Sequence, residues 1–224
     1  MRVMNDRLIS AAEERLALAR ARKKEALSRQ RHRDAAQWDW AELVAADQEL
    51  LAAEREVARV HGRQYALELT LDLAWDPGAP MPFLISNGHQ AAVIFYLLSS
   101  DQPEPTGAED MDDAVGAIVF DGVHDVQFGG LNDEAIEGHP LFGAGPVPYA
   151  AHEVLNSAWI TEAERRNSVH RFHKSGWHER KKHYVLCFHD ETLECIAADL
   201  RTERHPSGFG DAVRSVSTRL LHGE

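Results

Sequence analysis

The sequence predicts an α+β protein: an N-terminal antiparallel helical hairpin at residues 1–63, then a domain at 64–224 with an antiparallel β-sheet and one or two packed helices. Two observations support this fold class. Apolar residues in the first segment recur at spacings of three and four, whereas the next segments alternate with a period of two around Asn-Gly and Asp-Gly turns. Helices and hairpins that are separated along the chain are typical of α+β proteins.

The first 63 residues read as two helices with matching apolar seams. Alanine at alternate seam positions allows close approach, and the polar linker 28–37 favours an antiparallel hairpin. We expect Lys23 to extend to the edge of its seam. The hairpin arm either packs on its own β domain or forms a homodimer with a second copy. The seams are Ile9, Ala12, Leu16, Ala19, Lys23 and Ala26 in the first helix, and Leu43, Ala46, Leu50, Ala53, Val57 and Val60 in the second.

The following residues alternate between apolar and polar side chains, which predicts strands. Residues 66–75 read as one strand with a wet face. Asn87-Gly88 and Asp121-Gly122 each lie between apolar runs, which is the strongest short signal for a β-hairpin. The polar segment 99–113 is predicted to be a loop, 150–167 an amphipathic helix, and 211–221 a short C-terminal helix.

Residues 183–200 read as two strands joined by a tight turn. A two-residue turn and a four-residue loop both give one register, which places His189 opposite Glu194. That register sends Cys187 and Cys195 to opposite faces, so no cross-strand disulfide forms. A three-residue turn would instead place the two cysteines opposite each other. Both faces are mostly apolar, which predicts a central position in the sheet.

His189 opposite Glu194 is the candidate for catalysis. A neighbouring carboxylate raises the pKa of a histidine toward neutrality, where the ring is suited to general acid–base work. The alternative is that these side chains only cap and solvate a turn.

Five of the 13 histidines lie between residues 170 and 189. Imidazoles beside carboxylates suit zinc or iron, so His173, His183 and His189 are the candidate ligands, with Glu194 as general base. The spacing matches no strong metal motif, and exposure to solvent or to a partner is the alternative.

Charge is distributed unevenly along the chain. Residues 1–63 hold 13 Lys/Arg and 11 Asp/Glu, and residues 165–224 hold 11 and 8, but residues 64–164 hold 17 Asp/Glu and no Lys or Arg. Such a segment is solvated, paired with the flanking segments, or presented to a basic partner. Nucleic acid is disfavoured as a partner because phosphate binding needs clustered cations.

The loop "NDEAIEGHPL" concentrates polar side chains in a Gly/Pro setting, which makes it a better candidate for an interaction site than a helix face. The alternative is a turn-rich connector with ordinary solvation. Its candidate interaction residues are Asp133, Glu134, Glu137 and His139.

The segments "LNDEAIEGHPL", "EVLNSAWI" and "KHYVLCFHDETLECIA" resemble a scattered family of uncharacterised bacterial proteins. The resemblance covers residues 115–198 and excludes the helical arm. It implies a bacterial domain, and because that family carries no assigned activity, it implies nothing about mechanism.

No apolar run approaches the ~20 residues of a membrane span, and no secretory signal is visible, so we expect a cytoplasmic protein without a membrane partner. The leading hypothesis is an interaction protein of the immunity or inhibitor type, which presents an acidic surface to a basic protein. The alternative is a metal-assisted enzyme of a small-molecule pathway that uses the His/Glu cluster.

Overall fold

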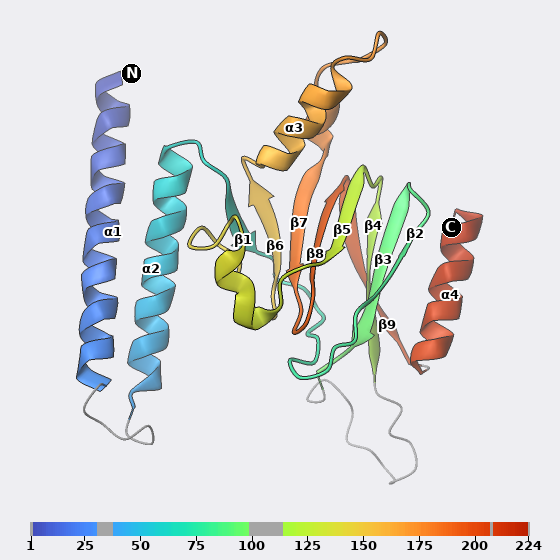
Figure 1. The fold of residues 1–224 in the computed structure, drawn as a ribbon, viewed down its shortest axis with the longest axis horizontal. Helices are drawn as coiled ribbons and strands as arrows, with labels where there is room; N and C mark the ends of the chain where they lie inside the picture. The colour runs from blue at the N-terminus through green and yellow to red at the C-terminus, as the bar shows by residue number, and fades with distance from the viewer. Residues whose placement is uncertain (1, 31–37, 99–113, 207, 224) are drawn as a thin grey trace.

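The structure, a computed structural model, describes residues 2–30, 38–98, 114–206 and 208–223. It has the α+β fold that the sequence predicts: a helical hairpin stands beside two stacked antiparallel sheets (Figure 1). The predicted loop at 99–113 lies outside the described residues.

The five-stranded sheet has the order β1-β6-β7-β8-β5, and the four-stranded sheet has the order β2-β3-β4-β9. The sequence predicted one sheet without dividing the strands between two. The strands are β1 (Tyr65–Glu68), β2 (Phe83–Ser86), β3 (Gln90–Tyr96), β4 (Val115–Asp121), β5 (Asp125–Gly129), β6 (Ala151–Leu155), β7 (Lys182–Cys187), β8 (Thr192–Ala197) and β9 (Asp199–His205). The helices are α1 (Arg2–Gln30), α2 (Trp40–Val60), α3 (Ala158–Asn167) and α4 (Phe209–His222), with 3-10 turns η3 (Asp133–Gly138) and η4 (Trp177–Arg180).

The alanine seams hold α1 and α2 together, as predicted. Ala26 and Ala46 are buried with Leu43 between the two helices. Lys23 reaches from the seam edge to Asp47 on α2, at 2.6 Å. Three more ion pairs join the helices, and their partners on α2 come earlier in the sequence as those on α1 come later, as an antiparallel arrangement requires. They are Arg15–Glu56 at 3.2 Å, Arg20–Glu54 at 3.5 Å and Arg29–Glu42 at 2.6 Å.

The arm packs beside the β domain through α2, and α1 lies on the outside (Figure 1). Arg55 of α2 donates to the carbonyl oxygen of Gly145 at 3.0 Å, which ties the arm to the loop before β6. Because the two seams face each other, the homodimer through the arm remains a prediction that would need another face of the hairpin.

The main core lies between the two sheets. Aromatic side chains from both sheets meet there: Phe95 of β3 lies 5.6 Å from Phe188, which follows β7, and Phe120 of β4 lies 5.6 Å from Tyr184 of β7. Trp75 contacts both Phe95 and Phe188. Burial of this many aromatic rings makes the sandwich interior the largest apolar contribution to stability.

Both outer faces of the sandwich are also covered. Helix α4 covers the four-stranded sheet with Ala212, Val216 and Leu220 (Figure 1). On the five-stranded sheet, η3 and the loop after it cover Val185 and Cys187 of β7 with Ile136 and Leu141. A polar side chain on this covered face therefore needs a partner inside the protein.

One predicted hairpin is confirmed and one is wrong. Asn87-Gly88 connects β2 to β3, and the Asn87 side chain accepts from the backbone N–H groups of His89 and Gln90. Asp121-Gly122 instead carries the chain from β4 in one sheet to β5 in the other. A tight turn with a positive φ at Gly122 serves a sheet crossover as well as a hairpin.

The predicted helix at 150–167 and the predicted strand at 66–75 are both too long. Residues 151–155 form strand β6, and α3 begins only at Ala158, because Asn156 adopts a positive φ of 54° between them. Strand β1 ends at Glu68, and the chain then crosses to the other sheet, where Trp75 pairs with Leu97.

The β7–β8 hairpin has a register that the sequence did not predict. Val185 lies opposite Glu194, and residues 188–191 form the loop, so the pairing of His189 with Glu194 is wrong. The predicted and observed registers differ by an even number of residues. Each side chain of β7 and β8 therefore still points to the predicted face of the sheet. Cys187 and Cys195 are free, buried and on opposite faces, and β7 is central, as predicted.

No helix within the described residues is both long enough and apolar enough to cross a membrane.

The alanine seam predicts a sharp difference between neighbouring alanines of α1. Ala26→Leu inserts a branched side chain where 1% of the alanine is exposed, and it should lower the free energy of unfolding by about 1–3 kcal/mol. Ala21→Leu, at an exposed position of the same helix, should change it by less than about 0.5 kcal/mol. Urea denaturation followed by circular dichroism measures both, and equal effects would contradict the packing described.

Candidate functional site

Two adjoining pockets open on the outer face of the five-stranded sheet, with volumes of about 280 and 240 Å3. They share Gln127, His139, Pro140 and Glu194 as lining residues. Strands β5 and β8 form the floor, and the loop after η3 and the start of α3 form the walls. Glu194 is the only carboxylate in either lining, and neither lining contains Lys or Arg.

Two imidazoles hold the Glu194 carboxylate. His183 lies diagonally across from it on β7, and His183 Nε2 is 2.8 Å from Glu194 Oε2. His139, which follows η3, places Nε2 3.4 Å from Oε1. Both imidazoles are buried, while 25% of the Glu194 side chain is exposed. The longer contact leaves His139 Nε2 without a good hydrogen bond among the described residues.

The other ring nitrogens fix how these imidazoles are protonated. The Leu141 N–H donates to His139 Nδ1 at 3.1 Å, so Nδ1 carries no proton and Nε2 does. Ser157 Oγ accepts from the Ile160 N–H and lies 2.9 Å from His183 Nδ1. Both imidazoles therefore present Nε2 to the Glu194 carboxylate, which as an ionised group can only accept from them.

The Glu194 carboxylate is ionised. Burial raises its pKa, but hydrogen bonds and electrostatic attraction from His139 and His183 outweigh burial and bring the pKa to about 2. The ionised carboxylate is partly open to the two pockets.

Ser157, His183 and Glu194 form a hydrogen-bonded chain that has the composition of a catalytic triad. The serine nevertheless lines neither pocket and is buried. Its hydroxyl is the N-cap of α3, accepting from the Ile160 N–H at 3.1 Å, and it lies 2.9 Å from His183 Nδ1. The chain therefore orients His183 and starts α3, and it offers no nucleophile to a ligand.

A second group of charged side chains lies at the end of the sheet formed by the β7–β8 loop and η3. Tyr149 donates to Asp133 Oδ2, and His189 Nδ1 lies 3.1 Å from the same oxygen. Tyr149 adopts a φ of 60°, which is rare for a residue with a side chain. The hydrogen bond from Tyr149, together with that from His189, lowers the pKa of Asp133.

We call Asp133, Glu134, Asp190 and Glu191 the acidic end. Asp190 is 72% exposed at its side chain, and His189 Nε2 lies 3.9 Å from it. Burial and the charge of Asp190 raise the pKa of Glu191. Within the described part of the chain, none of the four forms an ion pair with Lys or Arg, and one imidazole, that of His189, lies near two of them, Asp133 and Asp190.

The structure separates the candidate catalytic and metal-binding residues. His189 contacts Asp133 in the β7–β8 loop, His183 contacts Glu194, and His173 contacts Glu164 at 3.0 Å at the other end of the sheet, beside α3. His189 and Glu194 are therefore no catalytic pair. Across residues 2–30, 38–98, 114–206 and 208–223, no three His, Cys, Asp or Glu side chains are grouped to hold a metal ion.

The predicted interaction loop is divided between surface and interior. Asp133 and Glu134 belong to the acidic end, and Glu137 is exposed at the end of η3. His139 is buried against Glu194, so its assignment to an exposed surface is wrong. Its role was missed because a histidine after a glycine in a loop has no periodicity that indicates which way it points. Ser157 was missed because the predicted helix ran through it.

Part of the negative charge of residues 64–164 is compensated inside the protein. Asp121 pairs with Arg201, Glu153 lies 3.2 Å from Lys182, and Glu162 pairs with Arg165 and Arg166. The basic partners all come from the C-terminal 60 residues. Among the described residues, fewer carboxylates therefore lack a Lys or Arg partner than the sequence suggested. Those of the acidic end are among the ones that lack such a partner.

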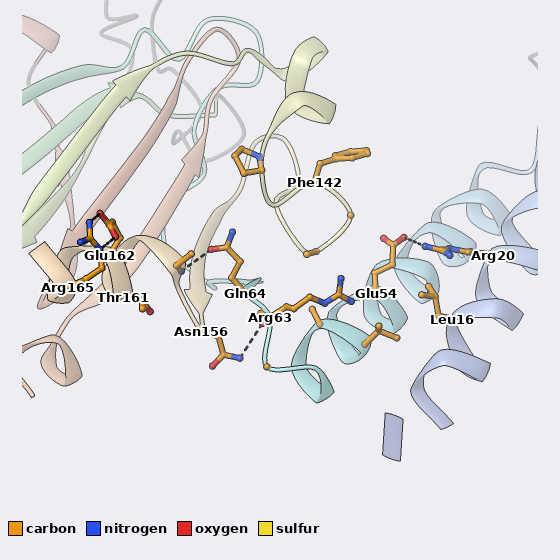
Figure 2. A pocket seen from close by; sticks show the side chains of 17 residues that line it. Leu16, Arg20, Glu54, Arg63, Gln64, Phe142, Asn156, Thr161, Glu162 and Arg165 are labelled. Carbon is orange, nitrogen blue, oxygen red and sulfur yellow. Dashed lines mark hydrogen bonds and ion pairs between the residues drawn. The ribbon is translucent and has the colours of Figure 1, made fainter. Parts of the chain in front are cut away.

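A further pocket, of about 920 Å3, is a groove between the arm and α3. Figure 2 shows Arg20 beside Glu54 on the arm and Arg165 beside Glu162 on α3, so these charges are paired within the groove wall. Gln64 of this groove accepts from the N–H of Ala158 at 3.0 Å. The groove contains no buried polar cluster, and the Glu194 pockets are therefore the better candidate site.

Comparison with known proteins finds no matching family model, no matching curated protein and no matching solved structure. The resemblance to an uncharacterised bacterial family remains a prediction, and the function has to be argued from the geometry.

The low pKa of Glu194 predicts a pH-dependent stability. Its folded pKa lies below its ordinary value, so its stabilisation is complete above about pH 4.5 and is lost as the pH falls toward 2. Glu194→Gln also replaces one carboxylate oxygen with an NH2 group. That group would face an imidazole N–H, so two donors would meet without an acceptor. The substitution should lower the free energy of unfolding by about 1–3 kcal/mol at pH 7, and by less at pH 3.

Urea denaturation at pH 7, 5, 4 and 3 measures this difference. Glu134→Gln, at an exposed position, is the matched control and should stay within about 0.5 kcal/mol of the unsubstituted protein. Parallel pH profiles for Glu194→Gln and the unsubstituted protein would contradict an ionised carboxylate held by two imidazoles.

Proposed function

We propose that this is a non-catalytic interaction protein of the bacterial cytoplasm, which binds a basic protein partner in the manner of an immunity or inhibitor protein. The acidic end is the proposed contact surface. The observation that carries the proposal is that four carboxylates gather there without a Lys or Arg ion pair among the described residues, and a single imidazole lies near two of them.

The charge of the acidic end suits fast association with a cation-rich surface. Its exposed carboxylates attract such a partner over about a Debye length, roughly 8–10 Å at physiological salt. The raised pKa of Glu191 reflects its burial and the nearby charge of Asp190, an interaction that a partner's cation would relieve. Charge complementarity of this kind increases association rates and excludes acidic competitors.

Aromatic side chains next to these carboxylates supply apolar contact area. Tyr149 is 39% exposed and is fixed by its hydrogen bond to Asp133. Phe128, also 39% exposed, lines the 280 Å3 pocket that opens beside Leu131 and Thr192. Exposed aromatic side chains among polar ones are typical of protein–protein interfaces.

Charge reversal at the acidic end tests the proposal. The probe is a fluorescently labelled Arg/Lys-rich peptide, and anisotropy gives its Kd. Glu134→Lys combined with Asp190→Lys should weaken binding at least tenfold, because it replaces attraction by repulsion at the contact surface. Binding to the unsubstituted protein should weaken at least tenfold between 50 and 300 mM salt.

The control changes the same net charge at a distant place. Asp6→Lys combined with Glu14→Lys alters two exposed carboxylates of α1, which lies on the far side of the arm. This variant should bind the peptide within about twofold of the unsubstituted protein. Equal losses in the two double variants would show that only the overall charge of the protein matters. Binding that is insensitive to salt would show that electrostatic attraction does not drive association, and either result would overturn the proposal.

A further inference from the structure

The pocket beside Glu194 has an ionised carboxylate and lining residues that suit a planar cation. Neither adjoining pocket is lined by Lys or Arg, and the Leu141 N–H donates to His139 Nδ1, which leaves that nitrogen without a proton. A carboxylate that is three-quarters buried, in pockets lined by no other carboxylate, Lys or Arg, favours a positively charged ligand over a neutral or anionic one.

The two imidazoles use only part of the carboxylate's capacity. Each carboxylate oxygen accepts about two hydrogen bonds. His183 occupies one position on Oε2, and His139 approaches one position on Oε1 at 3.4 Å. One acceptor position therefore remains on each oxygen, which matches the two parallel N–H groups of a guanidinium fork.

The rest of the lining completes such a site. Trp159 packs edge-on against His183, with ring centroids 5.1 Å apart, and its indole lines the 240 Å3 pocket. Guanidinium groups stack well on aromatic faces. Gln127 lines both pockets, and its side-chain amide forms no hydrogen bond with the rest of the described chain. Its oxygen is therefore available as a further acceptor.

We propose that the Glu194 pocket binds a guanidinium group, with Glu194 accepting two of its N–H groups and Gln127 and Trp159 completing the contacts. A compact ammonium would use only one carboxylate oxygen well. A metal ion is disfavoured, because no three His, Cys, Asp or Glu side chains among the described residues are arranged so that they could hold one.

The natural occupant is an arginine side chain of the basic partner, and this identification rests on the proposed function. The 280 Å3 pocket is lined by Leu131 and Thr192, which lie within two residues of Asp133 and Glu191 along the chain. It leads from the acidic end to Glu194. A basic segment held at the acidic end can therefore insert one arginine along β8.

The test compares N-butylguanidinium with N-butylurea, its uncharged analogue of nearly the same shape. Two-dimensional 1H–15N NMR of the full chain follows the indole signal of Trp159 and the side-chain amide of Gln127 during titration. We expect N-butylguanidinium to shift both signals saturably at millimolar concentration, and N-butylurea to bind at least tenfold more weakly. Equal affinity for the two probes would overturn the proposal. So would shifts that are confined to N–H signals outside the Glu194 pocket.

Two variants locate the site. Glu194→Gln should weaken N-butylguanidinium binding at least tenfold, and Gln127→Ala, at an exposed position that leaves the imidazole cluster intact, should weaken it about threefold or more. If Gln127→Ala folds normally and binds the probe unchanged, the pocket is not the binding site.

A third variant separates this proposal from the proposed function. Glu134→Lys combined with Asp190→Lys removes peptide binding at the acidic end but leaves the Glu194 pocket intact, and it should still bind N-butylguanidinium within about threefold. Failure of the small probe, with peptide binding still sensitive to the acidic end, would overturn the guanidinium pocket alone. Probe binding without peptide binding to the unsubstituted protein would overturn the proposed function alone.

Discussion

Glu194 is an ionised carboxylate on the covered outer face of the five-stranded sheet, and two imidazoles from different parts of the chain contact it. Such a group is stable only when charged or strongly polarised donors surround it. His183 comes from the neighbouring strand, His139 from the loop after η3, and Ser157 orients His183 while it caps α3. Glu194 is thereby linked through His183 and Ser157 to the start of α3, and through His139 to the loop after η3.

The same arrangement explains why the site suits binding better than chemistry. Catalysis would need a nucleophile or base that faces a ligand with a proton to exchange. Here the serine hydroxyl and both Nδ1 atoms are committed to internal hydrogen bonds, and the Glu194 carboxylate and the Gln127 side chain line both pockets. A fixed, partly desolvated negative charge is what a cation-binding site requires, and the acidic end continues that charge toward the surface.

The sequence was sufficient for features that depend on local periodicity. The alanine seams, the Asn87-Gly88 hairpin and the alternating faces of 183–197 are set by neighbours a few residues apart. It was insufficient where long-range pairing decides. The turn at Asp121-Gly122 joins two sheets, the β7–β8 register depends on packing of Phe188 into the core, and α3 begins where a positive φ at Asn156 ends β6. The Glu194 site combines three such long-range choices, which is why the predicted partner of Glu194 was His189 and not His183.

The most direct test of this account is the protonation state of the cluster, read by NMR from the imidazole 15N shifts of His139 and His183 and the side-chain carboxyl 13C shift of Glu194. We expect that at pH 7 both imidazoles carry a proton on Nε2, that His139 carries none on Nδ1, and that the Glu194 carboxyl group is ionised, with a pKa of about 2. A carboxyl group still protonated at pH 7, or a proton on His139 Nδ1, would contradict this account.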